Sequence, residues 1–260
     1  MVMPAVPPFF KAPRDLFSQQ ATNYAAFRPS YPSELIERIV GLAPGRDLAW
    51  DCATGNGQAA AQLASHFTRV LATDASASQL SAAKAHPRVA YRIAAEDDSG
   101  AQDGSIDLVT VAQALHWFDL PRFYDEVRRV LKPGGVIAAW CYGPVEVDPG
   151  IDAVMRWFEG ERLRGFRAPE LEHVDAGYRD IEFPFDEIPV VPSSMTMAAT
   201  REQFLGFVSS WSAVAAARLT GEDPLGDLDA KLSLVWPATD ERLARFPVGA
   251  RVGRAERLSA

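Results

Sequence analysis

Two glycines with G-x-G spacing, Gly55 and Gly57, separate an apolar run from an alanine-rich segment that we expect to be helical. A second apolar run ends at Asp74, nineteen residues after Gly55. A ligand can lie against the backbone of such a turn because glycine has no Cβ. An acidic residue about 20 positions after the glycines is placed to accept hydrogen bonds from ribose hydroxyls. The spacing therefore predicts a site for a nucleotide-like molecule.

A dinucleotide is one alternative, because Gly55, Gly57 and Ala60 nearly match the G-x-G-x-x-G/A fingerprint. Two features weigh against it. Asp51 lies at the junction of strand and turn, where a negative charge disfavours a pyrophosphate. No basic residue lies close to the turn to neutralise phosphates. The glycine pattern alone leaves the choice of ligand open.

The residues of this site must be positioned by strands that alternate with helices. Five short apolar runs are typical of buried strands, at 48–53, 69–74, 89–95, 106–112 and 136–142. Helical patterns lie between them, at 58–66, 76–86 and 120–131. Short strands that alternate with helices indicate βαβ units, and therefore a parallel sheet with helices on both faces. Residues that follow these strands are expected at the rim where open α/β sheets bind ligands.

After Pro144 the alternation gives way to a different pattern. Helices are expected at 151–166, 200–219 and 223–236, and strands at 180–188 and 246–256. We interpret this half as the completion of the same sheet plus a helical cover, and not as a separate domain, within one α/β fold. The predicted organisation is a flexible proline-rich N-terminus at 1–16 and one domain at 17–260, with its core at about 34–143 and the cover and last two strands at 144–260.

Composition narrows the range of partners. The 260-residue chain has a net charge of −8 and a pI of about 5.1, which argues against a broad nucleic-acid surface, because phosphates need clustered Lys and Arg. Cys52 and Cys141 lack metal-ligand spacing, so we expect free thiols and no metal. No signal-peptide pattern and no apolar run of membrane-spanning length are present. We expect a cytoplasmic monomer or homodimer without a membrane partner.

Several motifs together resemble the class I methyltransferases that use S-adenosylmethionine. The run DCATGNGQ at 51–58 resembles the first motif of that family, TD at 73–74 its ribose-binding motif, and AED at 95–97 its adenine-side motif. SIDLVTVAQALHWFD at 105–119 resembles the fourth strand of the subgroup near trans-aconitate methyltransferases, often called methyltransferase type 11. EVRRVLKPGGVIAAW at 126–140, NYAAFRPSYP at 23–32 and SSWSAV at 209–214 also resemble that subgroup. The resemblance runs from about Phe17 to the end of the chain.

The resemblance implies a Rossmann-like methyltransferase fold, with a seven-stranded mixed sheet whose last strand is antiparallel and helices on both faces. It also implies S-adenosylmethionine as cofactor, S-adenosylhomocysteine as product and a small-molecule acceptor, with a carboxylic acid suggested. The cofactor contacts that it implies come from Tyr24, Arg28, Asp51, Ala53, Thr54, Gly55, Asn56, Gly57, Asp74, Ala75, Ala95, Glu96, Gln113 and Trp117. The acceptor pocket that it implies is lined by Trp117, Trp140 and Tyr142.

Within this scheme, individual residues have competing roles. Asp51 either orients the turn or meets the methionine ammonium through water. Arg28 is expected to pair with the methionine carboxylate, and the Gln113 carbonyl to face the ammonium. Trp117 is expected to face the sulfonium or the acceptor through its π-cloud. His116 is either a general base or a residue that fixes the rim loop by hydrogen bonding.

The chain departs from the family pattern at two places. Ala53 stands where the first motif usually has a glycine, and residues 93–96 lack the aspartate often credited with holding the adenine amino group. Glu96, Asp97 or the backbone must then serve the adenine. Two other functions stay open at this point, an NAD-dependent oxidoreductase and a protein that binds S-adenosylmethionine without turnover. The sequence does not assign the acceptor atom.

Overall fold

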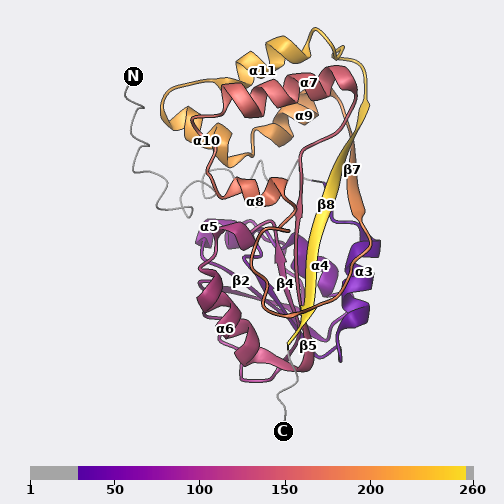
Figure 1. Ribbon diagram of the computed structural model, residues 1–260, viewed down its shortest axis with the longest axis vertical. Coiled ribbons are helices and arrows are strands. Elements are labelled where there is room, and N and C mark those ends of the chain that lie inside the picture. Colours follow the sequence, from indigo (N-terminus) through magenta and orange to yellow (C-terminus); the bar gives the residue numbers. More distant parts are fainter. Residues whose placement is uncertain (1–28, 256–260) are drawn as a thin grey trace.

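The computed structural model describes residues 29–255 as one mixed sheet flanked by helices, with a group of helices beyond one end of the sheet (Figure 1). Tyr24 and Arg28 lie outside the described residues, and the predictions for them stay predictions. The strands are β1 Leu48–Cys52, β2 Arg69–Asp74, β3 Val89–Ile93, β4 Ile106–Ala112, β5 Leu131–Tyr142, β6 Asp186–Glu187, β7 Ser193–Ala199 and β8 Arg242–Arg254. The helices are α3 Ser33–Leu42, α4 Gln58–Leu63, α5 Ala77–Ser81, η2 Leu115–Trp117, α6 Leu120–Val130, α7 Pro149–Trp157, η3 Phe158–Arg162, α8 Leu171–Asp175, α9 Arg201–Val208, α10 Ser212–Leu219 and α11 Pro224–Leu232.

Five strands form the parallel half of the sheet, in the order β3-β2-β1-β4-β5. Six of the seven residues of β4 are buried, which accounts for its nearly continuous apolar run. The predicted alternation of strands and helices is confirmed. Because parallel strands end at the same edge, the residues that follow β1, β2, β4 and β5 are gathered along one rim.

Helices cover both faces of this parallel half. Along β5, Ala138 and Trp140 belong to a buried cluster with α3, α4 and the C-terminal helices, whereas Ala139 and Cys141 belong to a cluster with α6. Successive side chains of a strand point to opposite faces, so one strand contributes to both cores. The predicted helices on both faces are therefore confirmed.

The antiparallel half of the sheet is organised around β8. This strand pairs with β5 in antiparallel register, which confirms the predicted direction of the last strand, and it also pairs with β6 and β7. The sheet of the described residues has eight strands instead of the seven expected. The expected strand at 180–188 is reduced to β6. The additional strand is β7, whose sequence SSMTMAA has few of the β-branched and aromatic residues that mark a strand, and pairing with β8 supplies its partners.

The helical cover lies beyond the carboxyl-terminal rim of the sheet (Figure 1). The expected helix at 200–219 forms two helices, α9 and α10, although its predicted capping box is present. The hydroxyls of Ser209 and Ser210 donate to the carbonyls of Gly206 and Phe207 at 2.6 and 2.7 Å. Such local bonds compete with helix continuation, and Trp211 follows in an extended conformation.

Two further properties concern the whole of the described chain. Within residues 29–255, no helix combines the length and the apolar character needed to cross a bilayer. Over the same residues, no three His, Cys, Asp or Glu side chains converge in a way that could hold a metal ion. Cys52 and Cys141 are buried free thiols, as expected from their spacing.

Candidate cofactor and acceptor site

The loop after β1 contains three residues in the left-handed region. Ala53, Gly55 and Gly57 have φ angles of 53°, 58° and 81°. Glycine adopts this conformation readily, whereas an alanine is strained there. A Cβ at Gly57 would collide with the Tyr91 hydroxyl, but one at Gly55 would meet only Oε1 of Gln79, at 3.8 Å. The loop therefore packs closely at Gly57, whereas at Gly55 the backbone is less crowded.

Asp74, at the end of β2, closes this loop. Its Oδ2 accepts a hydrogen bond from the Gly55 N–H at 2.8 Å, and its Oδ1 accepts one from the Ser76 N–H at 2.8 Å. Burial raises the pKa of the Asp74 carboxyl, and the two backbone donors lower it. Each carboxylate oxygen keeps lone-pair capacity for a further donor. Asp74 thus has a fixed orientation and spare acceptor sites.

Asp51 is almost fully buried beneath the loop and acts on its conformation. It accepts hydrogen bonds from the hydroxyls of Thr54 and Thr110, at 2.5 and 2.7 Å. Burial raises its pKa to about 6, and these hydroxyls partly offset the rise. Asp51 therefore orients the turn through Thr54. The role of Thr110 has no sequence signal, because it depends on the pairing of β1 with β4. Asn56, at the loop tip, is partly exposed.

The residues predicted on the ribose and adenine side follow β2 and β3. Ala75, Ala95 and Glu96 are all partly exposed. The two segments run side by side, since the N–H of residue 94 bonds the Asp74 carbonyl at 3.1 Å. Oε1 of Glu96 accepts a hydrogen bond from the Asp119 N–H at 3.3 Å. These residues are thus gathered near Asp74.

Gln113 connects this region with a pocket farther along the rim. It has a φ of 59°, and its N–H donates to the Trp140 carbonyl at 2.8 Å. Its side-chain amide donates to the Tyr142 carbonyl at 3.4 Å. These bonds hold the turn after β4 against the end of β5. Gln113 and Ala53 thus share a backbone conformation that is rare for residues other than glycine, and each directly follows a strand of the site.

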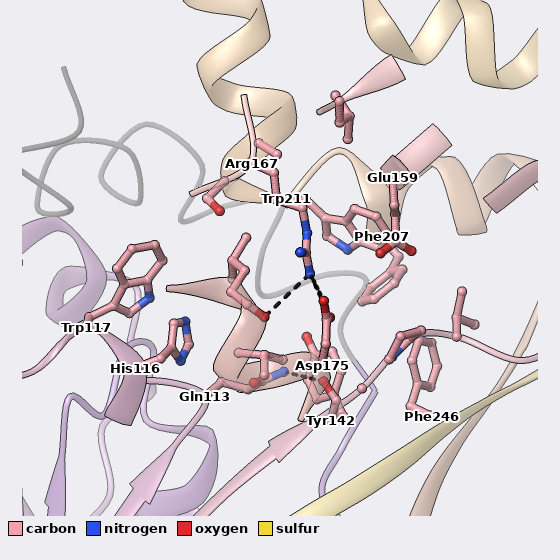
Figure 2. A pocket seen from close by; sticks show the side chains of 18 residues that line it. Gln113, His116, Trp117, Tyr142, Glu159, Arg167, Asp175, Phe207, Trp211 and Phe246 are labelled. Carbon is pink, nitrogen blue, oxygen red and sulfur yellow. Dashed lines mark hydrogen bonds and ion pairs between the residues drawn. The ribbon is translucent and has the colours of Figure 1, made fainter. Parts of the chain in front are cut away.

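The pocket lies between the rim of the sheet and the helical cover and has a volume of about 150 Å³. Its lining residues are Gln113, His116, Trp117, Tyr142, Gly143, Pro144, Val145, Glu159, Leu163, Arg167, Leu171, Val174, Asp175, Phe207, Trp211, Ser212, Ala213 and Phe246. In the view of Figure 2, His116 and Trp117 lie on one side and Glu159 and Phe207 on the other, with Arg167 reaching between them toward Asp175. The wall is mainly apolar and aromatic, as is typical of small-molecule sites.

Of the three residues predicted to line an acceptor pocket, Trp117 and Tyr142 line this cavity. Trp140 does not: it has no exposed surface and packs edge-on against Tyr31, with ring centroids 5.4 Å apart. Trp140 is on the same face of β5 as Tyr142, but it lies two residues farther from the rim, where Tyr31 covers it. The expectation for Trp140 is therefore corrected to a core position.

His116 is held on the pocket wall by Tyr178. The His116 Nδ1 and the Tyr178 hydroxyl are 2.9 Å apart, and both side chains are buried. Burial lowers the pKa of His116 to about 3, with a smaller contribution from His173. The imidazole is therefore neutral at physiological pH and has little tendency to take a proton. This geometry fits the expected loop-fixing role of His116 better than the alternative role as a general base.

Several pocket residues have no predicted role in the sequence. Trp211, in the extended link between α9 and α10, lines the pocket. Arg167 bonds both carboxylate oxygens of Asp175 at 2.6 Å. Glu159 lines the pocket from η3. The C-terminal half alone brings these residues together, and neither periodicity nor a motif marks them.

Known proteins share this organisation. A family described as a methyltransferase domain matches residues 50–139. A candidate methyltransferase from Dictyostelium discoideum is 34% identical over 234 residues, which cover 87% of this chain and 88% of that protein. A candidate S-adenosylmethionine-dependent methyltransferase from Saccharomyces cerevisiae is 25% identical over 229 residues, covering 74% and 79%.

One solved structure also matches at high identity. A candidate type II methyltransferase from Anaeromyxobacter dehalogenans has a TM-score of 0.81 and 41% identity, and the match covers 88% of this chain and 99% of that one. The similarity thus includes the helical cover as well as the parallel half. None of these proteins specifies the trans-aconitate subgroup, which stays a prediction. The chain belongs to the class I methyltransferases that depend on S-adenosylmethionine.

Proposed function

We propose that this enzyme transfers a methyl group from S-adenosylmethionine to a small molecule bound in the pocket beneath the helical cover. One observation carries the proposal. Gln113 borders the pocket and follows β4, which lies beside β1, so the pocket opens at the same rim as the Gly55 loop and Asp74. A donor held at the loop would face an acceptor held in the pocket.

The residues present fit the cofactor. The less crowded backbone at Gly55 suits the methionine part, and the spare lone pairs of Asp74 suit the two ribose hydroxyls. The turn at Gln113 would offer its carbonyl to the ammonium, with Ala95 and Glu96 on the adenine side. Thr54 and Asp51 would fix the loop, and Ala53, Asn56, Gly57 and Ala75 would shape it. Contacts from Tyr24 and Arg28 stay predictions of the resemblance.

The chemistry demands little of the side chains. S-adenosylmethionine, when bound, supplies a methyl group that its positive sulfur already activates. The protein then has to align the nucleophile with that carbon and exclude water, and such positioning supplies several kcal/mol. Trp117, on the pocket wall near Gln113, is placed for a π contact with the positive centre or the acceptor.

The pocket supports a small acceptor rather than a macromolecule. It is small, it lies between the rim and the cover, and Phe207, Trp211 and Phe246 make its wall largely aromatic. A carboxylic acid acceptor, which the resemblance suggests, stays a prediction. A carboxylic acid would need a cationic partner in the pocket. Among the described lining residues that cation is Arg167, and Arg167 already forms an ion pair with Asp175.

Ligand-dependent melting tests the proposal directly. A ligand that binds only the native state raises the melting temperature, so we expect S-adenosylmethionine and S-adenosylhomocysteine to raise it and NAD to leave it unchanged. A second assay follows labelled methyl incorporation into a panel of small acids, phenols and amines. A shift with NAD alone would support the oxidoreductase alternative. Cofactor binding with no incorporation into any acceptor would support a binding protein without turnover.

A further inference from the structure

Glu159 is an ionisable side chain of the pocket that the cofactor and the loops of the rim do not use. It lines the cavity, is partly exposed to it, and forms no hydrogen bond or ion pair with any residue in the described range 29–255. The charged neighbour Arg167 is already bound by Asp175 at 2.6 Å. A carboxylate that faces an aromatic cavity without a partner needs a hydrogen-bond donor from elsewhere, because a buried polar group left unpaired is costly.

A local distortion of the backbone directs Glu159 into the pocket. The helix α7 continues into η3, a π-helical turn in which the Leu163 N–H bonds the Phe158 carbonyl at 2.8 Å, five residues back. Phe158 is then fully buried, Glu159 faces the cavity, and Arg162 points outward to Glu222 and Asp227 at 2.6 Å each. Single π turns are uncommon and recur at functional sites.

The surroundings of Glu159 also set its acid–base behaviour. Burial raises the pKa of its carboxyl to about 7, while Arg167 lowers it and Asp175 raises it. A carboxyl group with this pKa exchanges a proton readily at neutral pH, which is the property of an effective general base. The other candidates in the pocket lack that property: His116 has its pKa lowered to about 3, and Asp175 is held by Arg167.

We infer that Glu159 is the acid–base residue of the acceptor pocket and that the acceptor is an uncharged, largely aromatic molecule methylated on a hydroxyl group. This inference rests on the proposed function. In the reaction, the hydroxyl oxygen forms a bond to the methyl carbon as the carbon–sulfur bond breaks. The electron pair of that bond stays on sulfur, which becomes neutral. The hydroxyl proton passes to the Glu159 carboxylate, so charge and atoms balance.

The pocket disfavours the other head groups. A carboxylate acceptor would meet Glu159 and Asp175, and it would have to displace Asp175 from Arg167 to gain a cationic partner. An ammonium nitrogen has no lone pair with which to attack the methyl carbon, and Glu159, with a pKa of about 7, is too weak a base to deprotonate it readily. A neutral hydroxyl avoids both problems, because it carries a lone pair for the attack and supplies a donor that Glu159 lacks among residues 29–255. The aromatic side chains Phe207, Trp211 and Phe246 suit a flat ring that carries this hydroxyl.

Three probes with one ring system test the inference: 2-naphthol, 2-naphthoate and 2-naphthylmethylammonium. Each is titrated calorimetrically into the full chain saturated with S-adenosylhomocysteine. We expect 2-naphthol to bind about tenfold or more tightly than 2-naphthoate, which the carboxylates of Glu159 and Asp175 repel, and Glu159→Leu to weaken the binding of 2-naphthol by about tenfold, since one hydrogen bond to a charged acceptor is lost. The ammonium probe tests turnover, because we expect it not to be methylated. The matched control is Glu161→Leu, because Glu161 lies on the same π turn but is exposed and outside the pocket.

Turnover separates proton transfer from binding. With S-adenosylmethionine carrying a labelled methyl, the wild type should methylate 2-naphthol, and Glu159→Gln should lower kcat by about 100-fold or more while KM changes little, because the amide still accepts a hydrogen bond but not the proton. Glu161→Gln should leave kcat unchanged.

Tighter binding of 2-naphthoate than of 2-naphthol, methylation of the ammonium probe, equal effects of the Glu159 and Glu161 substitutions, or bound 2-naphthol that the wild type does not methylate would overturn the inference. Failure of the chain to bind S-adenosylhomocysteine would instead overturn the proposed function. The two failures are therefore distinguishable.

Discussion

The backbone N–H of Gly55 and the Oδ2 of Asp74 are 2.8 Å apart, and this hydrogen bond ties the loop after β1 to the end of β2. The other oxygen of Asp74 accepts the Ser76 N–H, also at 2.8 Å. The carboxylate therefore has a fixed direction before any ligand arrives. Such preorganisation lowers the cost of binding, because no side chain has to be ordered. In the proposed function, the same carboxylate binds the ribose.

Replacing this carboxylate should weaken cofactor binding. Asp74→Ala removes the acceptor for both ribose hydroxyls and for Gly55, and hydrogen bonds to a charged group contribute about 1.5–3 kcal/mol each, so S-adenosylhomocysteine affinity should fall by about 100-fold or more. Isothermal titration calorimetry measures the change. Asp125→Ala, an exposed aspartate on α6, is the control. An unchanged affinity in Asp74→Ala would remove Asp74 from the ribose site.

The strained conformation of Ala53 predicts a stabilising substitution. Ala53→Gly removes the strain of an alanine in the left-handed region, with a φ of 53°. Glycine also makes the unfolded chain more flexible, which offsets part of the gain. We expect a net increase of about 0.5–1 kcal/mol in the free energy of unfolding. Urea denaturation measures it. Ala75→Gly is the matched control, because Ala75 follows β2 as Ala53 follows β1 but is not left-handed, and it should be destabilising. A loss of stability in Ala53→Gly would show that packing of the methyl group outweighs the strain.

The buried Asp51 predicts a pH-dependent stability difference. Its pKa is raised by burial from 3.8 to about 6, so its ionised form costs the native state about 3 kcal/mol. This cost is absent below pH 4, grows between pH 4 and 6, and is constant above. Asp51→Asn cannot ionise, so its stability relative to wild type should rise across that window by about this amount.

Urea denaturation at a series of pH values measures the Asp51 effect. The pH dependence of the difference is the informative quantity, because any change in hydrogen bonding to Thr54 and Thr110 adds a constant. Asp125→Asn serves as the control for removing an acidic charge from the surface. A difference between Asp51→Asn and wild type that does not vary with pH would contradict the raised pKa.

The bond between His116 and Tyr178 predicts energetic coupling. We expect His116→Ala and Tyr178→Phe each to destabilise the protein and to couple by about 1 kcal/mol in a double-mutant cycle, since either change leaves the other buried group unpaired. Tyr124→Phe is the control partner, because the Tyr124 hydroxyl donates to the Glu182 carbonyl at 2.8 Å and not to His116. Additive effects of His116→Ala and Tyr178→Phe would argue that the bond contributes nothing to the rim.

His116→Ala also separates the two roles weighed for the imidazole. S-adenosylhomocysteine affinity should be unchanged, because His116 lines the acceptor pocket and not the Gly55 loop. If His116 only fixes the rim, Tyr178→Phe should lower methyl transfer to the same extent as His116→Ala. A much larger loss in His116→Ala than in Tyr178→Phe, measured with labelled methyl groups, would instead assign His116 a direct role in proton transfer.

The sequence by itself determined the parallel half of the fold and the cofactor loop. Apolar strand patterns, the spacing of Gly55 and Gly57, and the acid at Asp74 are local signals, because each element is recognisable within a window of about 20 residues. The pattern also marked a last strand near β8, whereas its antiparallel direction came from the family resemblance. The same resemblance suggested Trp117 and Tyr142 as pocket residues, and both lie at the carboxyl ends of adjacent parallel strands.

The tertiary structure decided the acceptor pocket. The strand β7 depends on pairing with β8, and the pairing of Thr110 with Asp51 depends on the register of β1 and β4. Trp140 is a core residue because it lies two residues farther from the rim than Tyr142, where Tyr31 covers it. Glu159 enters the cavity through a π turn, which the residues FEGER do not signal. These positions result from contacts between segments far apart in the chain, whose energies no local pattern of residues records.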